Sequence, residues 1–245
     1  MRDFDPEETT LRRAWDENAG AWVRWARAGH DSFWRFHGRR FLELVPPPGR
    51  LTVDIGAGEG RLGRALISQG HRVVAVDSSF ALASAAASHA GPQPAVVGNA
   101  AALPLRPGCA DLAVAFMSLQ DVDDLVGAVS EVAGLLAPGA RLCMAVVHPL
   151  NSAGRFEGER EDREAPFVIR GSYLATHRYR DDAERDGVAM TFHSEHRPLE
   201  AYGRALEQAG LAIDAIREVT EEDPTDRWSR LPLFLHLRAV ATRSE

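Results

Sequence analysis

The sequence predicts an α/β fold in which a largely parallel sheet carries helices on both of its faces. Residues 51–60 pass from a short apolar run into three glycines at alternate positions, and helical apolar spacing follows directly. Residues 71–77 form a second short run that is rich in β-branched residues and ends on an acidic residue. Short apolar runs and helical segments continue to alternate after these two strands, which is typical of βαβ units.

Length, composition and charge limit the classes of protein that this chain can represent. Its 245 residues, of which 45% are hydrophobic, suit one α/β domain or one domain with an appendage. A formal net charge of −7 and the absence of a Lys/Arg stripe argue against nucleic acid as a partner. No apolar run approaches the ~20 residues of a membrane span, and the acidic start lacks the apolar core of a signal peptide. We therefore expect a cytoplasmic protein without a membrane partner.

The glycine-rich turn predicts a ligand site at the end of the first strand. Glycines leave no Cβ atoms between a ligand and the main chain, and the helix N-terminus that follows supplies free N–H groups and a partial positive charge. Gly58, Gly60 and Gly63 also spell the G-x-G-x-x-G dinucleotide fingerprint. Two side chains argue against a pyrophosphate there. Asp54 would repel phosphates and favour a cationic amine, and Arg61 takes the sixth position counted from the first glycine of the turn.

Residues 53–60 resemble the first motif of the class I S-adenosylmethionine-dependent methyltransferases, an acidic residue followed by G-x-G-x-G. Residues 135–142 resemble the third motif of the same family. The resemblance implies a Rossmann-like seven-stranded sheet, S-adenosylmethionine as the cofactor, and a methyltransferase activity. It also implies a set of cofactor-binding residues at the strand ends, to which one aromatic side chain is added: Asp54, Gly56, Ala57, Gly58, Gly60, Asp77, Ser78, Asn99, Ala100, Met117, Ser118 and Trp22.

Three residues of this set have specific expected roles. Asp77 ends the second strand, where a carboxylate can accept both ribose hydroxyl protons of an adenosine. Asn99 stands where the family usually carries Asp, and its amide can accept from the adenine amino group and donate to a ring nitrogen. Trp22, ahead of Trp15, is expected to line the sulfonium site, because an aromatic ring attracts a cation.

Residues 7–45 are predicted to form two helices with one aromatic face, and most of their tryptophans are expected to pack against the sheet. Asp31 or Ser32 would begin the second helix, and the prolines after Val45 would end it. His30 and Asp31 lie in the turn between these helices. They are candidates for an acid/base pair that contacts the substrate, with a helix cap as the favoured alternative for Asp31.

The sequence predicts an inserted lid after the fifth strand, because an unstructured loop of such length is rare inside a compact domain. Alternating residues at 173–180 and 187–194 predict a hairpin with a charged tip at 181–186. A helix and an antiparallel pair of strands are expected to complete the sheet. The chain is thereby divided into an N-terminal helical cap (1–48), a cofactor-binding core (49–147), the lid and substrate region (148–197) and the C-terminal part of the core (198–245).

Three histidines are expected to converge on the mouth of the site, and we consider them candidate general bases: His148, His193 and His196. The alternative for each is a hydrogen bond that holds the lid in place. Arg197 is a candidate for holding an acidic group of the substrate, or it pairs with Glu195 or Glu200. No metal site is predicted, because the two histidines of the lid lack a matching pair of Cys or acidic residues.

The favoured function is methyl transfer to a small-molecule acceptor, for example in secondary metabolism. The alternative is a protein of this fold that binds the cofactor without transferring methyl, such as a cyclase or a binding module. An NAD-dependent oxidoreductase is disfavoured by Asp54, by Arg61 and by the absence of any lysine for a Tyr-x-x-x-Lys pair. The sequence leaves open the acceptor atom and the oligomeric state, for which a homodimer is one candidate.

Overall fold

The computed structural model describes residues 2–3, 10–88, 93–159 and 161–242. Residues 7–9, where the sequence predicts the first helix to begin, and residue 89, predicted to end a later helix, lie outside these ranges. Among the described residues, none of the helices combines the length and the hydropathy that crossing a membrane requires.

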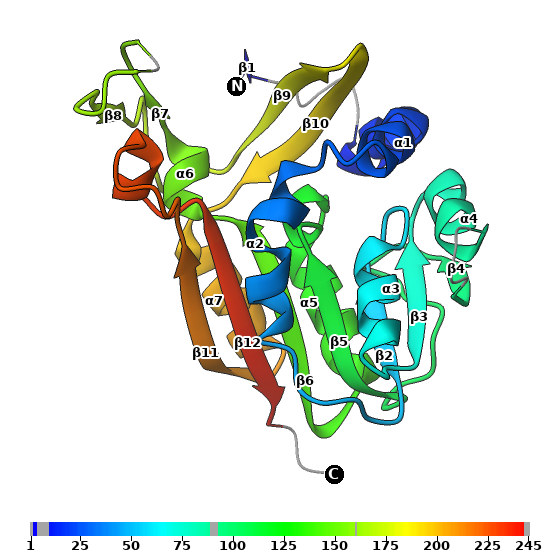
Figure 1. Cartoon of the computed structure of the whole chain (residues 1–245). Helices are drawn as coiled ribbons and strands as arrows, with labels where there is room; N and C mark the ends of the chain where they lie inside the picture. Colours follow the sequence, from blue (N-terminus) through cyan, green and yellow to red (C-terminus); the bar gives the residue numbers. More distant parts are fainter. Residues whose placement is uncertain (1, 4–9, 89–92, 160, 243–245) are drawn as a thin grey trace.

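A seven-stranded sheet forms the centre of the molecule, as predicted (Figure 1). Along the sheet the strands lie in the order β11 (Leu211–Val219), β12 (Phe234–Ala241), β6 (Leu136–Val147), β5 (Ala110–Phe116), β2 (Thr52–Ile55), β3 (Val73–Asp77) and β4 (Ala95–Val97). The strands from β6 to β4 are parallel to one another, and β12 lies antiparallel between β6 and β11. The strand order reverses between β2 and β5, and in open α/β sheets the ligand crevice lies at such a point.

Helices cover both faces of this sheet and bury two apolar clusters against it. On one face α5 (Leu125–Leu135) and α7 (Leu199–Gln208) pack on each other and on the sheet, with Val132 and Leu206 fully buried. On the other face Phe41 of α2 (Ser32–Leu42) meets Leu66 of α3 (Arg61–Ser68) over Val114 of β5. A further helix, α4 (Phe80–Ser88), packs beside β3 and β4. The apolar strands are buried on both sides, as the continuous runs of the sequence predict.

The two N-terminal helices form as the sequence indicates, with side-chain caps. In α1 (Leu11–Arg27) the Thr10 hydroxyl accepts a hydrogen bond from the Arg13 N–H. In α2 the Asp31 carboxylate accepts from the Trp34 N–H, so the expected cap is confirmed. The second helix ends at Leu42, earlier than predicted, because the N–H groups of Leu44 and Val45 bond only three residues back and tighten the last turn.

The inserted region contains the predicted hairpin, formed by β9 (His177–Arg185) and β10 (Val188–His196). The predicted charged tip is too long, because β9 extends through it and only Asp186 and Gly187 turn the chain. Both have positive φ, 48° and 74°, as a tight two-residue hairpin turn requires. The hairpin packs on α1 above the sheet, and β1 (Arg2–Asp3) pairs with β9 (Figure 1).

Three shorter elements complete the insertion: α6 (Pro149–Ala153), β7 (Arg155–Phe156) and β8 (Phe167–Val168). Two 3-10 turns, η1 (Leu119–Asp121) and η2 (Arg227–Arg230), follow β5 and precede β12. The strand predicted at 110–119 therefore ends at Phe116. The helix predicted at 122–137 begins only at Leu125, because Asp124 caps it, and it ends before Leu136, where β6 begins.

Candidate active site

A cavity of about 480 Å³ opens at the carboxyl ends of β2, β3 and β5, beneath α1, α2 and the β9–β10 hairpin. Of the residues that the resemblance assigns to the cofactor, all but one line this cavity: Asp54, Gly56, Ala57, Gly58, Asp77, Ser78, Asn99, Ala100, Met117, Ser118 and Trp22. The structure thus brings together residues from the N-terminal helices and from four strand ends.

The glycine-rich turn brings bare main chain to the cavity. Gly56 and Gly58 have φ values of +66° and +58°, which side chains rarely adopt. A Cβ atom on Gly56 would lie 2.5 Å from the Cβ atom of Ser118, and one on Gly58 would lie 2.9 Å from Nε1 of Trp22. Gly60 faces away from the cavity, because its own Cβ position lies 2.4 Å from Nε2 of Gln93. Gly60 therefore supports the turn from behind.

Asp77 ties the end of β3 to the glycine-rich turn. Its carboxylate accepts hydrogen bonds from the N–H groups of Gly58, at 2.8 Å, and Ser79, at 2.9 Å. Burial raises the pKa of this carboxyl to about 6, although both hydrogen bonds oppose the rise. A carboxylate has about four acceptor positions, so capacity for two hydroxyl donors remains.

Asp54 supplies a buried carboxylate next to the same turn. Its side chain is only 1% exposed, and its Oδ2 atom has no hydrogen-bond partner among the described residues. Burial, with the charge of Asp77 as a second cause, raises the pKa of the carboxyl to about 7. An acceptor atom left unsatisfied in such a place is costly unless a ligand supplies the donor. The orphaned oxygen and the bare turn together fit a ligand that carries a cationic amine.

The ends of β4 and β5 complete the floor of the cavity. Asn99 accepts a hydrogen bond from the Ala101 N–H through Oδ1, which orients the amide. Met117 adopts a positive φ of 56°, a conformation that non-glycine residues rarely keep outside functional sites. Ser118 donates to the carbonyl of Ile55 at 2.7 Å, so the end of β5 is fixed to the end of β2.

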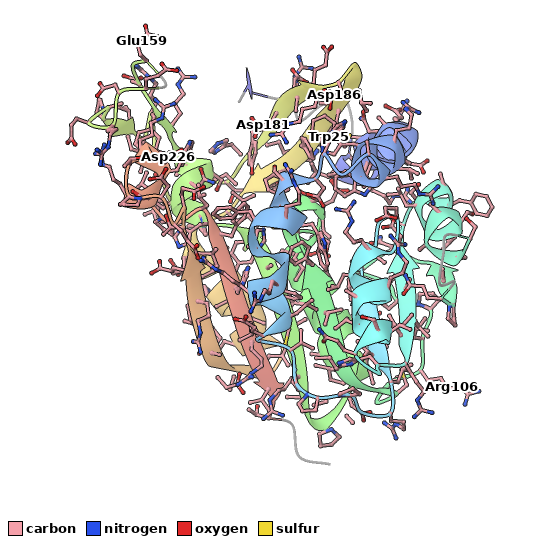
Figure 2. The ribbon with its side chains drawn as sticks, in the orientation of Figure 1. Trp25, Arg106, Glu159, Asp181, Asp186 and Asp226 are labelled. Carbon is pink, nitrogen blue, oxygen red and sulfur yellow. The ribbon has the colours of Figure 1, made fainter. Side chains whose placement is uncertain are left out.

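The roof of the cavity is aromatic. Trp22 packs edge-to-face against Trp15 at 6.0 Å and against Phe192 of the hairpin at 6.2 Å, measured between ring centroids. Trp15 also donates from Nε1 to the carbonyl of His193 at 2.8 Å, which joins α1 to β10. Both tryptophans line the cavity, and Trp22 lies over Gly58 as its expected role requires. Figure 2 labels Trp25 of α1 and the hairpin residues Asp181 and Asp186, and the Trp25 ring packs edge-to-face on Phe192 of the same hairpin at 6.1 Å between centroids.

The structure does not bring the three candidate bases to the cavity wall. His148 caps α6 by accepting from the Leu150 N–H, and its Nε2 atom lies 3.1 Å from a carboxylate oxygen of Glu218. Pro149 starts α6 directly after the strand, and this turns the His148 ring away from the cavity.

Helix α1 and the β9–β10 hairpin together form the cover of the cavity. The two histidines of β10 make contacts within this cover and with the inserted region beside it. The ring nitrogens of His196 lie 2.7 Å from the Ser152 hydroxyl and 2.8 Å from the Tyr173 carbonyl. Nε2 of His193 lies 3.4 Å from the side-chain amide of Asn18. Burial is the main cause that lowers the pKa of both imidazoles, as it does for His148. These contacts agree with the alternative expectation that histidines hold the lid in place.

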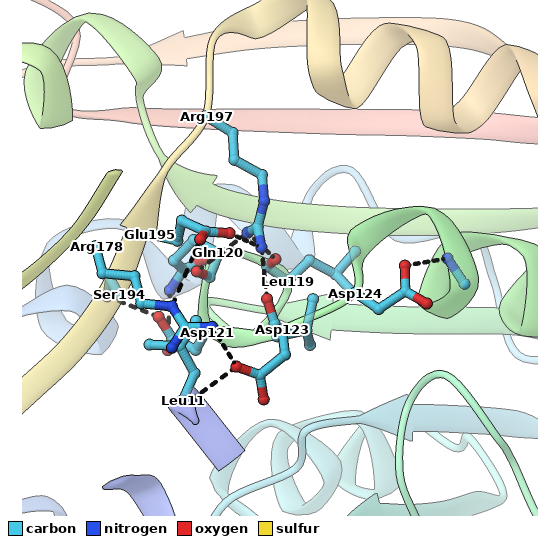
Figure 3. A network of polar contacts seen from close by, with 12 residues as sticks. Leu11, Leu119, Gln120, Asp121, Asp123, Asp124, Arg178, Ser194, Glu195 and Arg197 are labelled. Carbon is cyan, nitrogen blue, oxygen red and sulfur yellow. Dashed lines mark hydrogen bonds and ion pairs between the residues drawn. The ribbon is translucent and has the colours of Figure 1, made fainter. Parts of the chain in front are cut away.

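The two candidate substrate ligands also lie outside the cavity wall. His30 packs on Trp25 at 5.2 Å between ring centroids, and its Nε2 atom lies 3.7 Å from a carboxylate oxygen of Asp186. Arg197 is buried and forms an ion pair with Glu195, one of the two expected partners. Its guanidinium also donates to the carbonyls of residues 119, 120 and 122 (Figure 3). Arg197 therefore binds the turn after β5.

Sequence reasoning missed the cavity residues of the hairpin and of the turn after β5. One face of β9 and β10 contributes Tyr179, Asp181, Ala183, Arg185, Phe192 and Ser194 to the lining, and η1 contributes Asp121. The alternating positions on β9 and β10 are the available signal, since residues two apart on a strand share a face. The charged composition of 181–186 concealed that signal.

Comparisons with known proteins agree with this geometry. Residues 53–144 match the family model of a methyltransferase domain. A demethylmenaquinone methyltransferase from Mycolicibacterium gilvum is 34% identical over 114 residues, which are 46% of this chain and 48% of that protein. One from Corynebacterium kroppenstedtii is 32% identical over the same shares. The chain spans about half the length of the curated relatives that it matches.

Solved structures show the same fold over nearly the whole chain. An S-adenosylmethionine-dependent methyltransferase from Mesorhizobium loti has a TM-score of 0.67 and 22% identity, and covers 83% of this chain and 97% of its own. A [4+2]-cyclase has a TM-score of 0.63 and 15% identity, and covers 96% of this chain and 98% of its own. The predicted fold is confirmed by these structures, and residues 53–144 resemble the methyltransferase-domain family.

Proposed function

We propose that this protein transfers a methyl group from S-adenosylmethionine to a small-molecule acceptor, an intermediate of secondary metabolism being one such class. The observation that carries the proposal is one cavity that joins the bare glycine-rich turn, the carboxylate at the end of β3 and an aromatic roof. When bound, the cofactor supplies a methyl group on a positively charged sulfur that is already a good leaving group. The protein has to bind, align and exclude water.

The residues present fit the cofactor. Asp77 would accept from the ribose hydroxyls, and Asn99 would use its side-chain amide on the adenine edge. The unpartnered oxygen of Asp54 would accept from the amine of the methionine part. Trp22 would attract the sulfonium through its ring, an interaction worth on the order of 0.5–2 kcal/mol.

The cover of the cavity supports a small acceptor. Helix α1 and the hairpin lie over the strand ends and leave a partly covered space whose roof includes the rings of Trp15, Trp22 and Phe192. The matching relatives are named for demethylmenaquinone, a small molecule. His148, His193 and His196 would act here by holding the cover, because none of them lines the space where an acceptor would bind.

The Asp77→Ala variant tests the cofactor site. We expect the affinity for S-adenosylmethionine to fall roughly 100-fold, because the variant lacks the buried carboxylate that would accept from the two ribose hydroxyls. The fold should be retained. Calorimetry measures the affinity, and the circular dichroism spectrum checks the fold. Asp182→Ala is the matched control, since Asp182 is exposed on the outer face of the hairpin. Unchanged affinity in Asp77→Ala, or a wild-type protein that binds NAD in place of S-adenosylmethionine, would contradict the proposal.

Formation of S-adenosylhomocysteine tests the transfer itself. A labelled methyl group should move to an acceptor from a small-molecule panel, with one equivalent of S-adenosylhomocysteine formed. The second candidate function is that of a non-methylating cyclase, because a [4+2]-cyclase shares this fold. Conversion of an acceptor without S-adenosylhomocysteine would favour a non-methylating cyclase.

A further inference from the structure

The turn after β5 presents a carboxylate to the part of the cavity beneath the hairpin. Asp121 ends η1 and lines the cavity. It accepts a hydrogen bond from the Ser194 hydroxyl at 2.7 Å and one from the Gln120 amide at 3.3 Å. Its own N–H donates to the carbonyl of Ser118, which stands next to Gly56 of the glycine-rich turn. Asp121 therefore lies one short turn away from the proposed cofactor site.

The polar network around Asp121 fixes its main chain and leaves the carboxylate beside Ser194 (Figure 3). Arg197 donates at 3.3–3.4 Å to the carbonyls of Leu119 and Gln120 and at 2.5 Å to that of Val122. The same guanidinium is ion-paired with Glu195. Arg197 thus holds the turn at three carbonyls, two before Asp121 and one after it.

The electrostatic surroundings suit a proton acceptor. Burial raises the pKa of Asp121 well above its ordinary value, while the Ser194 hydrogen bond, the Arg197 charge and the Gln120 amide oppose the rise. The phenols of Tyr179 and Tyr202 also interact with its charge, and Arg178, Glu195 and Asp123 belong to the same polar network (Figure 3). Burial raises the pKa of both phenols, that of Tyr202 to about 12. Both phenols are therefore neutral at physiological pH. A carboxyl with a raised pKa takes up a proton more readily near neutral pH than an ordinary one.

A flat apolar wall stands beside this carboxylate. Phe192 lies two residues before Ser194 on β10, so both side chains are on the same face of the hairpin. Three rings of the N-terminal helices surround Phe192 edge-to-face, Trp22 at 6.2 Å, Trp25 at 6.1 Å and Phe33 at 5.8 Å between centroids. These contacts fix the Phe192 ring, which lines the cavity.

We propose that the acceptor is a flat aromatic compound with a hydroxyl group, which packs on Phe192 and gives its proton to Asp121. This inference rests on the proposed function and names its substrate class. A lone pair of the hydroxyl oxygen forms the new O–CH3 bond, the electrons of the S–CH3 bond return to sulfur, and the hydroxyl proton goes to a carboxylate oxygen of Asp121. The products are the methyl ether, neutral S-adenosylhomocysteine and protonated Asp121, so atoms and charge balance.

The test is a binding experiment on the full chain saturated with S-adenosylhomocysteine. The probes are 1-naphthol, its saturated analogue decahydro-1-naphthol, and 1-methylnaphthalene, which lacks the hydroxyl. Quenching of tryptophan fluorescence measures affinity. Carbon-13 resonances of labelled aspartate carboxyls report on Asp121, whose signal is assigned by its loss in Asp121→Asn.

We expect 1-naphthol to bind at least tenfold more tightly than the saturated analogue. The Asp121 resonance should shift with 1-naphthol and stay in place with 1-methylnaphthalene. Phe192→Leu should weaken 1-naphthol binding to the S-adenosylhomocysteine-saturated protein at least fivefold. Phe80→Leu is the matched control, because Phe80 is 74% exposed outside the cavity. Ser194→Ala should move the titration of Asp121 to higher pH, because a hydrogen bond that stabilises the carboxylate is lost.

Equal affinity for 1-naphthol and decahydro-1-naphthol would overturn the proposal that the acceptor is aromatic. An Asp121 resonance that does not shift with 1-naphthol would overturn the role of Asp121 as proton acceptor. Binding of S-adenosylhomocysteine without any binding of 1-naphthol would overturn this inference while the proposed function stands. Failure of S-adenosylhomocysteine itself to bind would overturn both.

Discussion

Asp54 and Asp77 place two buried carboxylates at adjacent strand ends of the glycine-rich turn. Burial is the first cause that raises the pKa of each, and the charge of Asp77 adds to the rise at Asp54. In the free protein an ionised Asp54 is therefore unfavourable, whereas a cationic amine beside its open oxygen would favour the carboxylate. Asp54, which completes the proposed cofactor site, thus lowers the stability of the free protein at neutral pH.

The pH dependence of unfolding tests this description of Asp54. Its folded-state pKa of about 7 exceeds the ordinary 3.8, so the folded protein holds the extra proton between these values. The free energy of unfolding should therefore fall as pH rises from about 4 to 7. Asp54→Asn should reduce this slope, of which Asp77 contributes a further part, and be more stable than wild type at pH 8 by roughly 1–3 kcal/mol. Chemical denaturation at several pH values measures it, and identical pH profiles for the two proteins would contradict the assignment.

At the scale of elements, the strand ends and the hairpin were predictable, whereas the hairpin residues that face the cavity were not. Asp77 and Ser118 follow from local runs of sequence, because each strand of a parallel sheet ends at the same edge. His148 stands at that edge too, yet the proline after it starts a helix that turns the ring elsewhere. The hairpin face that carries Phe192 depends on pairing with β9 and on packing against α1, which no local pattern specifies.

Gly58→Ala tests the glycine-rich turn as a close approach to ligand. The new Cβ atom would lie 2.9 Å from Nε1 of Trp22 and would occupy the space over the turn. We expect a folded protein whose S-adenosylmethionine affinity drops at least tenfold by calorimetry. Gly108→Ala is the matched control, because Gly108 has a similar φ of 65° and its Cβ position has no neighbour within 4 Å. Similar affinities in the two variants would mean that the turn does not contact the cofactor.

At the scale of the whole molecule, Asp123 joins three distant parts of the chain. Its carboxylate accepts from the N–H groups of Leu11 and Arg12 at the start of α1, and it pairs with Arg178 of β9 at 2.8 Å (Figure 3). The first helix, the hairpin and the turn after β5 therefore share one anchor. The seven-stranded core could be inferred from sequence, whereas this anchor could not, because its partners lie more than fifty residues apart along the chain.

Asp123→Ala should loosen the cover and leave the core unchanged. The change removes the acceptor of two helix N–H groups and one of the ion-pair partners of Arg178, so amides of α1 and the hairpin should exchange hydrogen about tenfold faster. Amides of β2, β3 and β5 should keep their protection. Hydrogen exchange read by mass spectrometry makes the comparison, with Asp226→Ala as control, since Asp226 caps only the separate turn η2. Uniformly faster exchange would show that cover and core open together.

The two elements that form the cavity roof, α1 and β10, are synthesised at different times. Helix α1 leaves the ribosome early, and the strand that carries Phe192 and the carbonyl bound by Trp15 follows only after the parallel core has emerged. A nascent chain therefore passes through a stage in which the crevice is open, because Trp15 and Trp22 of α1 cannot yet contact β10. Ligand capture at that stage would consequently be weak, and the cavity is complete only when β10 has docked on α1.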